Sequence, residues 1–418
     1  MLKADTDMAQ SQAEQLDAAD PLARYRDSFA LPADMIYLDG NSLGPLPIGL
    51  HARMQRAVEH EWGHGLVRSW NEAGWYPAPL RTGAWIARLI GARETEVIVC
   101  DSTSVNLFKI LAAALDKQAG RNVIVAEEGD FPTDGYVAAG VARLTGATVR
   151  FEPPERIEAA IGEAGSDLAV VQLTHVNYKT ARVHDMARIT RATQAQGGLA
   201  VWDLCHSAGA MPVDLNGCNA DFAVGCGYKY LNGGPGAPAF LFVAERHLQG
   251  LRQPIQGWHG HAAPFGFEDG YRAHSGIERM LAGTAPQLSL IALEAALEVF
   301  ESVDMHALRA KSVSLCELFI QLVEQELAGC GFALASPRDA DRRGSHVSLA
   351  HEHGYAIMQA LIAEGVVGDF REPDILRFGF APLYVRHVDV RDAVAALTDV
   401  MRSRSWDRPE FRARKAVT

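Results

Sequence analysis

Short β-rich runs alternate with helix-like stretches between residues 97 and 243, and this alternation restricts the fold more than any other feature of the sequence. Two of the intervening stretches, Val105–Ala119 and Met186–Gln196, have helical patterning. Such alternation is typical of a mostly parallel sheet with helices on both faces, and it predicts an α/β fold. The runs predicted as strands are Val97–Cys100, Asn122–Ala126, Ala147–Phe151, Leu168–Leu173, Leu199–Asp203, Phe222–Cys226 and Ala239–Val243.

The C-terminal part of the chain predicts a second, smaller domain. A long helix beginning near Ala285 is expected to close the large domain, and an α+β domain with strands near Ser345–Leu349 and Ile375–Gly379 is expected to follow. We therefore expect three parts: an N-terminal segment that packs with the small domain (1–60), a large cofactor-binding domain (61–301) and a small C-terminal domain (302–418).

Composition argues against several classes of protein. A net charge of −12 disfavours a surface for nucleic acid or for an anionic membrane. No apolar run reaches the length of a membrane span, and the polar, acidic start of the chain shows no secretory signal. The six cysteines have no C-x-x-C spacing, which is typical of free thiols in a reducing compartment. We expect a cytoplasmic protein without a metal site.

Two residues near the ends of predicted strands indicate the chemistry. Asp203 ends the run A-V-W-D, and Lys229 lies 26 residues further on, between Tyr228 and Tyr230 and before a glycine-rich turn. An amine held among aromatic rings is partly desolvated, which favours the neutral form that a Schiff base requires. Either residue alone is more often a turn carboxylate or a solvated lysine. Together they match the needs of pyridoxal 5'-phosphate (PLP), an anion at its pyridine nitrogen and an amine at its aldehyde.

Motifs along nearly the whole chain resemble those of the kynureninase family. Its members are PLP enzymes of fold type I in the class-V aminotransferase-like group. The lysine motif alone would fit several PLP families, but the full set in this order is specific. The resemblance implies a mostly parallel central sheet with helices on both faces and a smaller α+β C-terminal domain. The motifs are Y-L-D-G-N-S-L-G-P-L-P (Tyr37–Pro47), D-S-T-S-V-N-L (Asp101–Leu107), F-P-T-D (Phe131–Asp134), W-D-L-C-H-S-A-G (Trp202–Gly209), G-Y-K-Y-L-N-G-G-P-G (Gly227–Gly236), Q-G-W-H-G (Gln256–Gly260) and L-R-F-G-F-A-P-L-Y (Leu376–Tyr384).

The residues expected to hold the cofactor follow several of the predicted strands. Thr103 and Ser104 open a predicted helix, where hydroxyls and free amides suit a phosphate, although S/T/D runs also cap helices in any protein. The resemblance implies that Phe131 stacks on the pyridine ring and that two further residues come from the other subunit of a homodimer with shared active sites, namely Trp258 and Thr284. The complete expected set is Thr103, Ser104, Phe131, Pro132, Thr133, Asp134, Thr174, Asp203, His206, Tyr228, Lys229, Trp258 and Thr284.

The resemblance also implies the catalytic and substrate-binding residues. Lys229 forms the Schiff base, Asp203 holds the pyridine nitrogen protonated, and Tyr228 binds phosphate and donates a proton. Arg377, in a predicted strand of the small domain, is expected to grip an α-carboxylate with its planar fork. His64 and Asn41 are expected to face the substrate.

The implied reaction is hydrolytic cleavage of the Cβ–Cγ bond of L-kynurenine, and of 3-hydroxykynurenine, in tryptophan catabolism and NAD biosynthesis. The products are L-alanine and anthranilate or 3-hydroxyanthranilate. One alternative is a cysteine desulfurase or an aminotransferase of the same class. A desulfurase needs a mobile reactive cysteine, whereas Cys316 and Cys330 lie in apolar, patterned surroundings typical of inert thiols. A PLP-binding regulator without turnover is a second alternative, but it would not explain Arg377 together with Tyr228.

Overall fold

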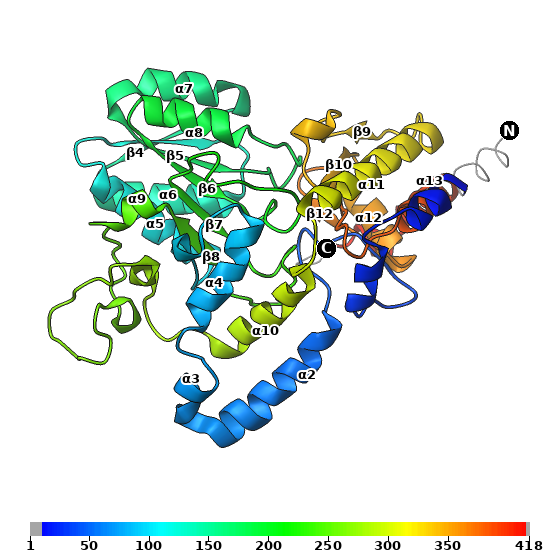
Figure 1. The fold of residues 1–418 in the computed structure, drawn as a ribbon. Helices are drawn as coiled ribbons and strands as arrows, with labels where there is room; N and C mark the ends of the chain where they lie inside the picture. Colours follow the sequence, from blue (N-terminus) through cyan, green and yellow to red (C-terminus); the bar gives the residue numbers. More distant parts are fainter. Residues whose placement is uncertain (1–10, 415–418) are drawn as a thin grey trace.

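The computed structural model describes residues 11–414, in which a seven-stranded sheet and a four-stranded sheet are each packed against helices (Figure 1). The larger sheet has the strand order β2-β8-β7-β6-β5-β3-β4. Only β8 runs antiparallel to its neighbours, so the predicted mostly parallel sheet is confirmed. Its strands are β2 (Val97–Val99), β3 (Val123–Glu127), β4 (Thr148–Glu152), β5 (Leu168–Thr174), β6 (Leu199–Asp203), β7 (Phe222–Gly225) and β8 (Phe240–Val243).

Both faces of this sheet are covered because successive side chains along each strand point to opposite sides. Ile98 and Ile124 pack in one apolar cluster with α5 and α6, while Val97 and Val125 pack in another with α4, α7 and α8. The helices of this part are α3 (Ser69–Glu72), α4 (Ala78–Leu89), α5 (Thr103–Lys117), α6 (Pro132–Thr145), α7 (Ile157–Ala164), α8 (Met186–Ala195), α9 (Glu245–Leu248) and α10 (Gln287–Leu297). The predicted layering of helix, sheet and helix is therefore confirmed.

The smaller sheet is antiparallel and has one apolar and one polar face. Its order is β12-β13-β10-β9, formed by Asp369–Arg371, Ile375–Gly379, His346–Ala350 and Ala333–Leu334. Val347, Leu376 and Phe378 point into the core, whereas alternate residues such as His346 and Arg377 lie on the other face. The helices of this part are α11 (Met305–Glu326), α12 (Gly354–Ala363), α13 (His387–Ser403) and α14 (Pro409–Arg412).

The N-terminal segment contacts both parts of the molecule. Residues 11–18 are helical, β1 (Ile36–Tyr37) pairs in parallel with β11 (Val366–Val367), and Asp20 forms an ion pair with Lys311 at 2.6 Å. Further on, α2 (Ile48–Arg56) packs against α10 and continues into a π-helical stretch, Ala57–Gly65. The division of the chain at residues 60 and 301 stays a prediction, and residues 1–10 and 415–418 of that division lie outside the described part.

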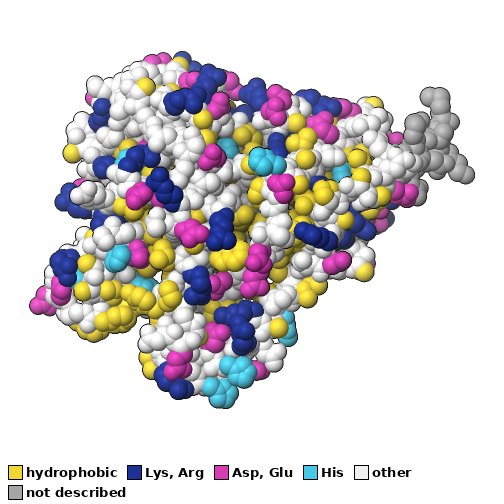
Figure 2. Space-filling model, in the orientation of Figure 1, with side chains coloured by type: hydrophobic (Ala, Val, Ile, Leu, Met, Phe, Trp, Pro, Cys, Tyr) yellow, Lys and Arg dark blue, Asp and Glu magenta, His cyan; other side chains and the backbone are white. Residues whose placement is uncertain are grey.

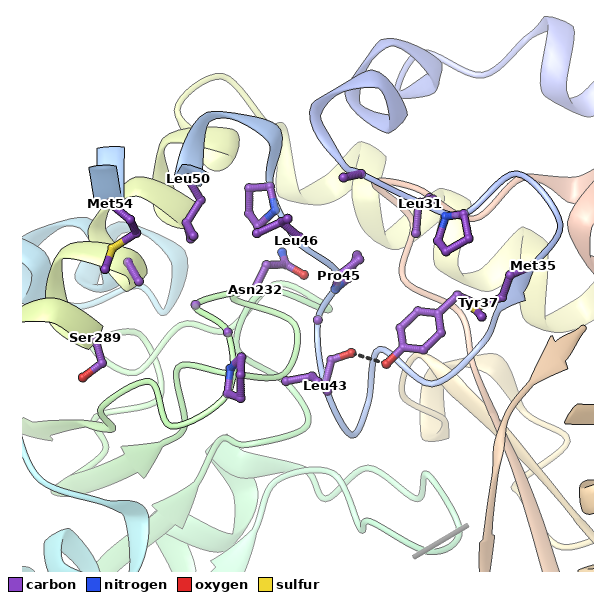
Figure 3. A pocket seen from close by; sticks show the side chains of 18 of the residues that line it. Leu31, Met35, Tyr37, Leu43, Pro45, Leu46, Leu50, Met54, Asn232 and Ser289 are labelled. Carbon is purple, nitrogen blue, oxygen red and sulfur yellow. Dashed lines mark hydrogen bonds between the residues drawn. The ribbon is translucent and has the colours of Figure 1, made fainter. Parts of the chain in front are cut away.

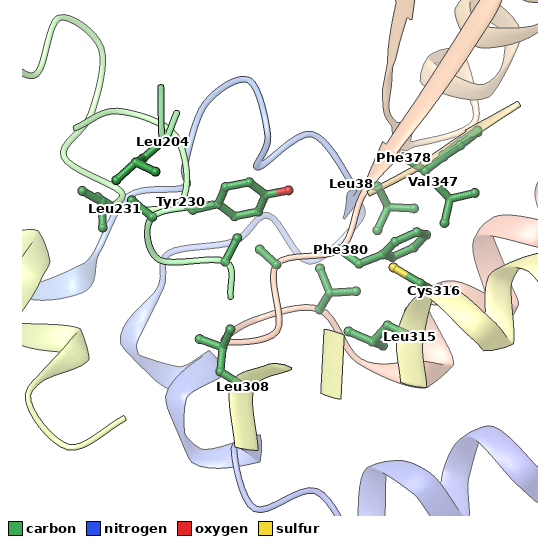
Figure 4. Packing of buried hydrophobic residues seen from close by; sticks show 14 of the residues in the cluster. Leu38, Leu204, Tyr230, Leu231, Leu308, Leu315, Cys316, Val347, Phe378 and Phe380 are labelled. Carbon is green, nitrogen blue, oxygen red and sulfur yellow. The ribbon is translucent and has the colours of Figure 1, made fainter. Parts of the chain in front are cut away.

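A continuous apolar cluster joins the two sheets behind the lysine motif (Figure 4). Leu204 and Leu231 belong to it on the side of the large sheet, and Phe380 belongs to it on the side of the small sheet. Tyr230 lies between them, and its hydroxyl donates to the carbonyl of Ser345 at 3.2 Å. The residue that follows Lys229 is thus anchored in the core, which restricts where the lysine can lie.

Among the helices of residues 11–414, none is long and apolar enough to cross a membrane.

Candidate active site

A cavity lies at the carboxyl ends of the parallel strands, which is where open α/β sheets bind their ligands. Loops and helix starts that follow β2, β3, β5, β6 and β7 all contribute to it. Most of the predicted cofactor residues are brought together here. The cavity is lined by Ser102, Thr103, Ser104, Phe131, Thr133, Asp134, Thr174, Asp203, Cys205, His206, Cys226, Tyr228, Lys229, Ala237 and Ala239.

Lys229 and His206 are in direct contact inside this cavity. The lysine Nζ lies 2.9 Å from the Nε2 atom of His206, and it lies 5.9 Å from the ring centres of both Phe131 and Tyr228. Burial lowers the pKa of His206 well below its usual range, and the neighbouring charge of Lys229 lowers it further. His206 is therefore a neutral imidazole whose Nε2 can accept a hydrogen bond from the amine.

Two buried carboxyl groups, Asp203 and Asp134, line the cavity side by side. Asp203 ends β6, and its Oδ1 accepts from the backbone N–H of Cys205 at 2.6 Å. Burial raises the pKa of Asp203, while that hydrogen bond and the charge of Lys229 act against the rise. Burial, followed by the charge of Asp203, raises the pKa of Asp134 well above its usual range. The pKa of both carboxyl groups is therefore raised, and only Asp203 has a backbone N–H donor among its causes that acts against the rise.

The phosphate end of a cofactor would meet the start of α5. Ser102 caps this helix by accepting from the backbone N–H of Val105 at 3.4 Å, and Thr103 and Ser104 form its first turn beside the cavity. The first N–H groups of a helix lack partners within the helix and attract anions. At the base of the same helix, Asp101 is held by an ion pair with Lys109 at 2.6 Å.

The structure adds residues that sequence reasoning missed. Asp130 accepts from the backbone N–H of Thr174 at 3.0 Å and from its hydroxyl, so it fixes the threonine at the cavity wall. The signal was present, because Asp130 directly precedes the F-P-T-D motif in the turn that follows β3. Cys205 and Cys226 also line the cavity. They lie two residues beyond Asp203 and Val224, which pair with each other in the adjacent strands β6 and β7. All six cysteines are free thiols, as expected.

Arg377 is buried in the small sheet and already holds a carboxylate of the chain. Its Nε donates to Asp369 Oδ1 at 2.7 Å, and its Nη2 donates to Asp369 Oδ2. On its outer edge, Nη1 donates to the carbonyl of Tyr178 at 2.5 Å and Nη2 to the hydroxyl of Ser42 at 3.1 Å. The outer edge of the guanidinium group therefore has two partners within the protein, Tyr178 and Ser42, that a substrate carboxylate would have to replace.

Six of the predicted residues lie outside the lining of the cavity, namely Pro132, Trp258, Thr284, Arg377, His64 and Asn41. His64 is exposed, and its Nδ1 lies 2.6 Å from the carbonyl of Glu59. Asn41 is fully buried, and within residues 11–414 its side-chain amide has no hydrogen-bond partner. Pro132 and Thr284 are exposed, and Trp258 stacks on His259 at 4.8 Å with a third of its surface open.

The residues that line the cavity fit PLP. The Oδ2 atom of Asp134 and the Nδ1 atom of His206 are buried without a hydrogen-bond partner among the described residues, and a buried polar atom of this kind normally pairs with a ligand or water. An amine, a carboxyl group and a helix start lie around one cavity, which meets the needs of the aldehyde, the pyridine nitrogen and the phosphate. Among the described residues, no group of side chains is suited to hold a metal ion.

Comparison with known proteins agrees with this geometry. Cysteine desulfurase from Thermococcus onnurineus NA1 is similar in structure, with a TM-score of 0.77 and 18% identity, over 91% of this chain and 98% of that one. The C-DES protein with glycine covalently linked to its PLP cofactor gives a TM-score of 0.78 and 18% identity, over 90% of this chain and 99% of that one. At this level of identity the likeness concerns the fold, which is that of PLP enzymes of fold type I.

Sequence comparison identifies the family. Kynureninases from Burkholderia mallei (strain SAVP1) and Pseudomonas fluorescens are each 50% identical to this chain, over 96% of this chain and 98% of theirs. Residues 308–397 match the kynureninase C-terminal domain family. The fold and the cavity define a PLP-dependent enzyme of fold type I. The chain belongs to the kynureninase family, and it is a hydrolase of that type acting on carbon–carbon bonds in ketonic substances.

Proposed function

We propose that this enzyme cleaves the Cβ–Cγ bond of L-kynurenine, and that of 3-hydroxykynurenine, to L-alanine and anthranilate or 3-hydroxyanthranilate. This proposal rests on one observation: Lys229 and Asp203 line the same cavity, in a chain that is 50% identical to kynureninases. The place in tryptophan catabolism and NAD biosynthesis, and the cytoplasmic location, stay predictions.

Bound PLP supplies an electron sink that makes the α-proton acidic and allows the Cβ–Cγ bond to break. In the proposed roles, Asp203 pairs with the pyridine nitrogen and keeps it protonated, with Asp134 as its neighbour. Lys229 Nζ holds the cofactor through its aldehyde, and this amine later takes the α-proton. His206 keeps the amine in place through the 2.9 Å contact.

Tyr228 is proposed as a proton donor. It lines the cavity beside Lys229, and burial raises the pKa of its hydroxyl, followed by the neighbouring Cys226 and Cys205. The hydroxyl therefore stays protonated at neutral pH, as a group that donates a proton to a leaving carbon must. The same hydroxyl is expected to contact the phosphate.

Arg377 is proposed to bind the α-carboxylate, with Asn41 and His64 facing the substrate. Support for Arg377 comes from its outer edge, which donates to Tyr178 and Ser42 next to the Phe131 wall of the cavity. A bidentate arginine–carboxylate pair gives both strength and orientation. Buried Asn41 supports a substrate role because its amide has no partner among the described residues.

The direct test is to supply L-kynurenine or 3-hydroxykynurenine to the PLP-loaded enzyme and to follow the formation of anthranilate or 3-hydroxyanthranilate, respectively, together with the release of alanine. We expect turnover of both substrates, with equal amounts of the two products. Sulfur release from cysteine, without anthranilate formation from kynurenine, would instead favour the desulfurase alternative. The Cys330→Ala variant is a matched control, because it would abolish a desulfurase with this nucleophile and leave a kynureninase unchanged.

We further propose a homodimer with shared active sites. An open apolar pocket of about 580 Å³ lies between the N-terminal loop, the glycine-rich turn after Lys229 and α10 (Figure 3). Leu43, Leu46 and Leu288 line it and expose a third to a half of their surface. Phe265 and Phe267 are also exposed. Figure 2 shows further apolar side chains gathered on this face of the molecule. Apolar surface of this kind usually marks a protein interface.

A shared site would account for Trp258 and Thr284, which lie outside the cavity of their own chain. If they bind the phosphate, they have to reach the cavity of the second subunit. Analytical ultracentrifugation is expected to show a dimer, and Leu46→Glu is expected to weaken it and to lower PLP retention. Leu144→Glu is a matched control, since Leu144 is also exposed but lies on α6, away from this pocket. A monomeric wild-type enzyme that retains PLP would contradict the proposal.

A further inference from the structure

Two arginines lie on the polar face of the small sheet, and they differ in how open they are to a ligand. The side chain of Arg377 is 1% exposed, whereas that of Arg371 is 34% exposed. Strand alternation places both on the same face, because Asp369 pairs with Arg377 and Arg371 pairs with Ile375 in adjacent strands. Of these two side chains, the one that solvent reaches is therefore that of Arg371.

The two arginines converge on the same small set of oxygens. Arg371 Nη2 lies 2.7 Å from Asp369 Oδ2, the oxygen that also accepts from Arg377 Nη2. The hydroxyl of Ser42 lies within 3.4 Å of Arg371 Nη2 and 3.1 Å of Arg377 Nη2, and it donates to Asp369 at 2.7 Å. Asp369 thus holds the guanidinium groups side by side, and Ser42 lies between their outer edges.

This cluster also lies within electrostatic reach of the cofactor cavity. The charges of Arg377 and Arg371 both lower the pKa of His206, after burial, Lys229 and His346. Tyr178 connects the two places, because its carbonyl accepts from Arg377 and its ring packs edge-on against Phe131 at 5.3 Å. A substrate held at Lys229 can therefore direct its carboxylate towards this cluster.

The net charge of the cluster favours the binding of one more anion. Burial raises the pKa of Asp369, but hydrogen bonds and charge from Arg377 outweigh this and lower it to about 2, so Asp369 is ionised. Burial, followed by the charge of Asp369, raises the pKa of Asp39 to about 7. When Asp39 is protonated, two guanidinium groups face one carboxylate, and the cluster carries one positive charge in excess.

We propose that Arg371 is a second binding residue for the α-carboxylate of the substrate, beside Arg377. This inference rests on the proposed function. Arg371 offers the solvent-facing donors, and Arg377 adds its outer edge once Ser42 or the Tyr178 carbonyl moves aside. Two guanidinium groups around one carboxylate would select strongly for amino acids over the corresponding amines.

The test compares Arg371→Met and Arg371→Lys with wild-type enzyme, all loaded with PLP. The matched control is Arg402→Met, which removes a half-exposed arginine of the same domain whose ion pair with Glu326 spans 3.4 Å. For Arg371→Met we expect the KM for L-kynurenine to rise at least tenfold, with kcat changed less than threefold. Arg371→Lys should recover part of the loss, and Arg402→Met should behave like wild type.

A second measurement separates contact with the carboxylate from a structural role. Binding of L-kynurenine and of its decarboxylated analogue is followed by stopped flow through the absorbance of the cofactor, before kynurenine is cleaved. Arg371→Met should weaken only the carboxylate-bearing ligand, with unchanged cofactor absorbance and melting temperature. Equal weakening of both ligands, or no weakening, would overturn the inference. If wild-type enzyme binds both ligands without cleaving kynurenine, the proposed function fails while the role of Arg371 is still decided.

Discussion

The cofactor side and the carboxylate side of the site differ in how their residues are brought together. On the cofactor side, the side chains follow the ends of β3, β5, β6 and β7, which are arranged in one sheet, so the sheet itself places them. On the carboxylate side, Arg377 contacts Tyr178, 199 residues away, and Ser42, 335 residues away. Three separate segments of chain have to meet there.

This difference implies a division of labour. Under the proposed roles, the groups of the cofactor side perform the chemistry, and the carboxylate side is an assembled contact that selects the substrate. Changes on the first side should therefore suppress turnover without altering the preference for a carboxylate. Changes on the second side should alter substrate binding while the cofactor stays in place. Each of the following predictions can break or sharpen this contrast.

The largest effect is expected from Lys229→Ala. Without the amine, neither the covalent link to the cofactor nor removal of the α-proton is possible, so turnover should fall to background. Borohydride reduction followed by peptide mapping should fix the cofactor to Lys229 in wild-type enzyme and to no residue in the variant. Cofactor fixed to Lys109 or Lys179 in the wild type would show that the reacting amine is misassigned.

Asp203→Asn should have the next largest effect. The amide keeps the shape of the side chain but loses the charge that holds the pyridine nitrogen protonated. One electrostatic contact that strengthens in the transition state is worth about 10²–10³-fold in kcat. The KM for kynurenine should change little, because Asp203 lies on the cofactor side. Stopped-flow measurement of α-proton removal checks this, and a normal rate in PLP-loaded Asp203→Asn would refute the role.

The same contrast explains how much of the molecule could be predicted from the sequence. The bounds of the strands in the large sheet were predicted to within one or two positions, because apolar runs indicate where parallel strands begin and end. The residues that follow these strands could therefore be located as well. Asp203 and Lys229 could be grouped for this reason, whereas Phe131 was assigned to the site through the family resemblance. The family resemblance added Arg377, but not its setting.

The contacts of Arg377 with Asp369, Ser42 and Tyr178 were missed because no local pattern connects residues that meet across hundreds of positions. The alternation in H-V-S-L-A and I-L-R-F-G does predict a sheet with one polar face. It does not reveal which loop covers that face, since this depends on how the two parts of the molecule pack. The partner of a buried charge is therefore the kind of contact that sequence reasoning of this type fails to find.

A smaller effect is expected from Arg377→Lys. An ammonium cannot reproduce the two-point contact that the planar guanidinium of Arg377 is proposed to make with the substrate α-carboxylate. Loss of a buried charge-assisted pair costs about 2–5 kcal/mol, so kcat/KM should fall at least about tenfold. PLP content should be unchanged. A variant that loses PLP, or that handles the decarboxylated analogue equally poorly, would show that Arg377 supports the fold and not the substrate.

The smallest effect, and the one that most sharpens the contrast, concerns Asp39. Burial and the charge of Asp369 raise the pKa of Asp39 to about 7, and its Oδ1 has no hydrogen-bond partner among the described residues. As the pH rises through 7, Asp39 becomes an anion close to Arg377 and Arg371, where it opposes an incoming carboxylate. The KM for kynurenine should therefore rise by a few fold above pH 7, and Asp39→Asn should remove this rise.

Stability gives an independent check on the same proton. Between the ordinary pKa of 3.8 and about 7, the folded state holds a proton on Asp39 that the unfolded state releases. The contribution of Asp39 to the free energy of unfolding therefore falls as the pH rises through this window. Asp39→Asn should remove that part of the slope when denaturant unfolding is compared at pH 5 and pH 7. Identical pH profiles for both proteins, in KM and in stability, would mean that Asp39 is already ionised and that the carboxylate side carries no excess positive charge.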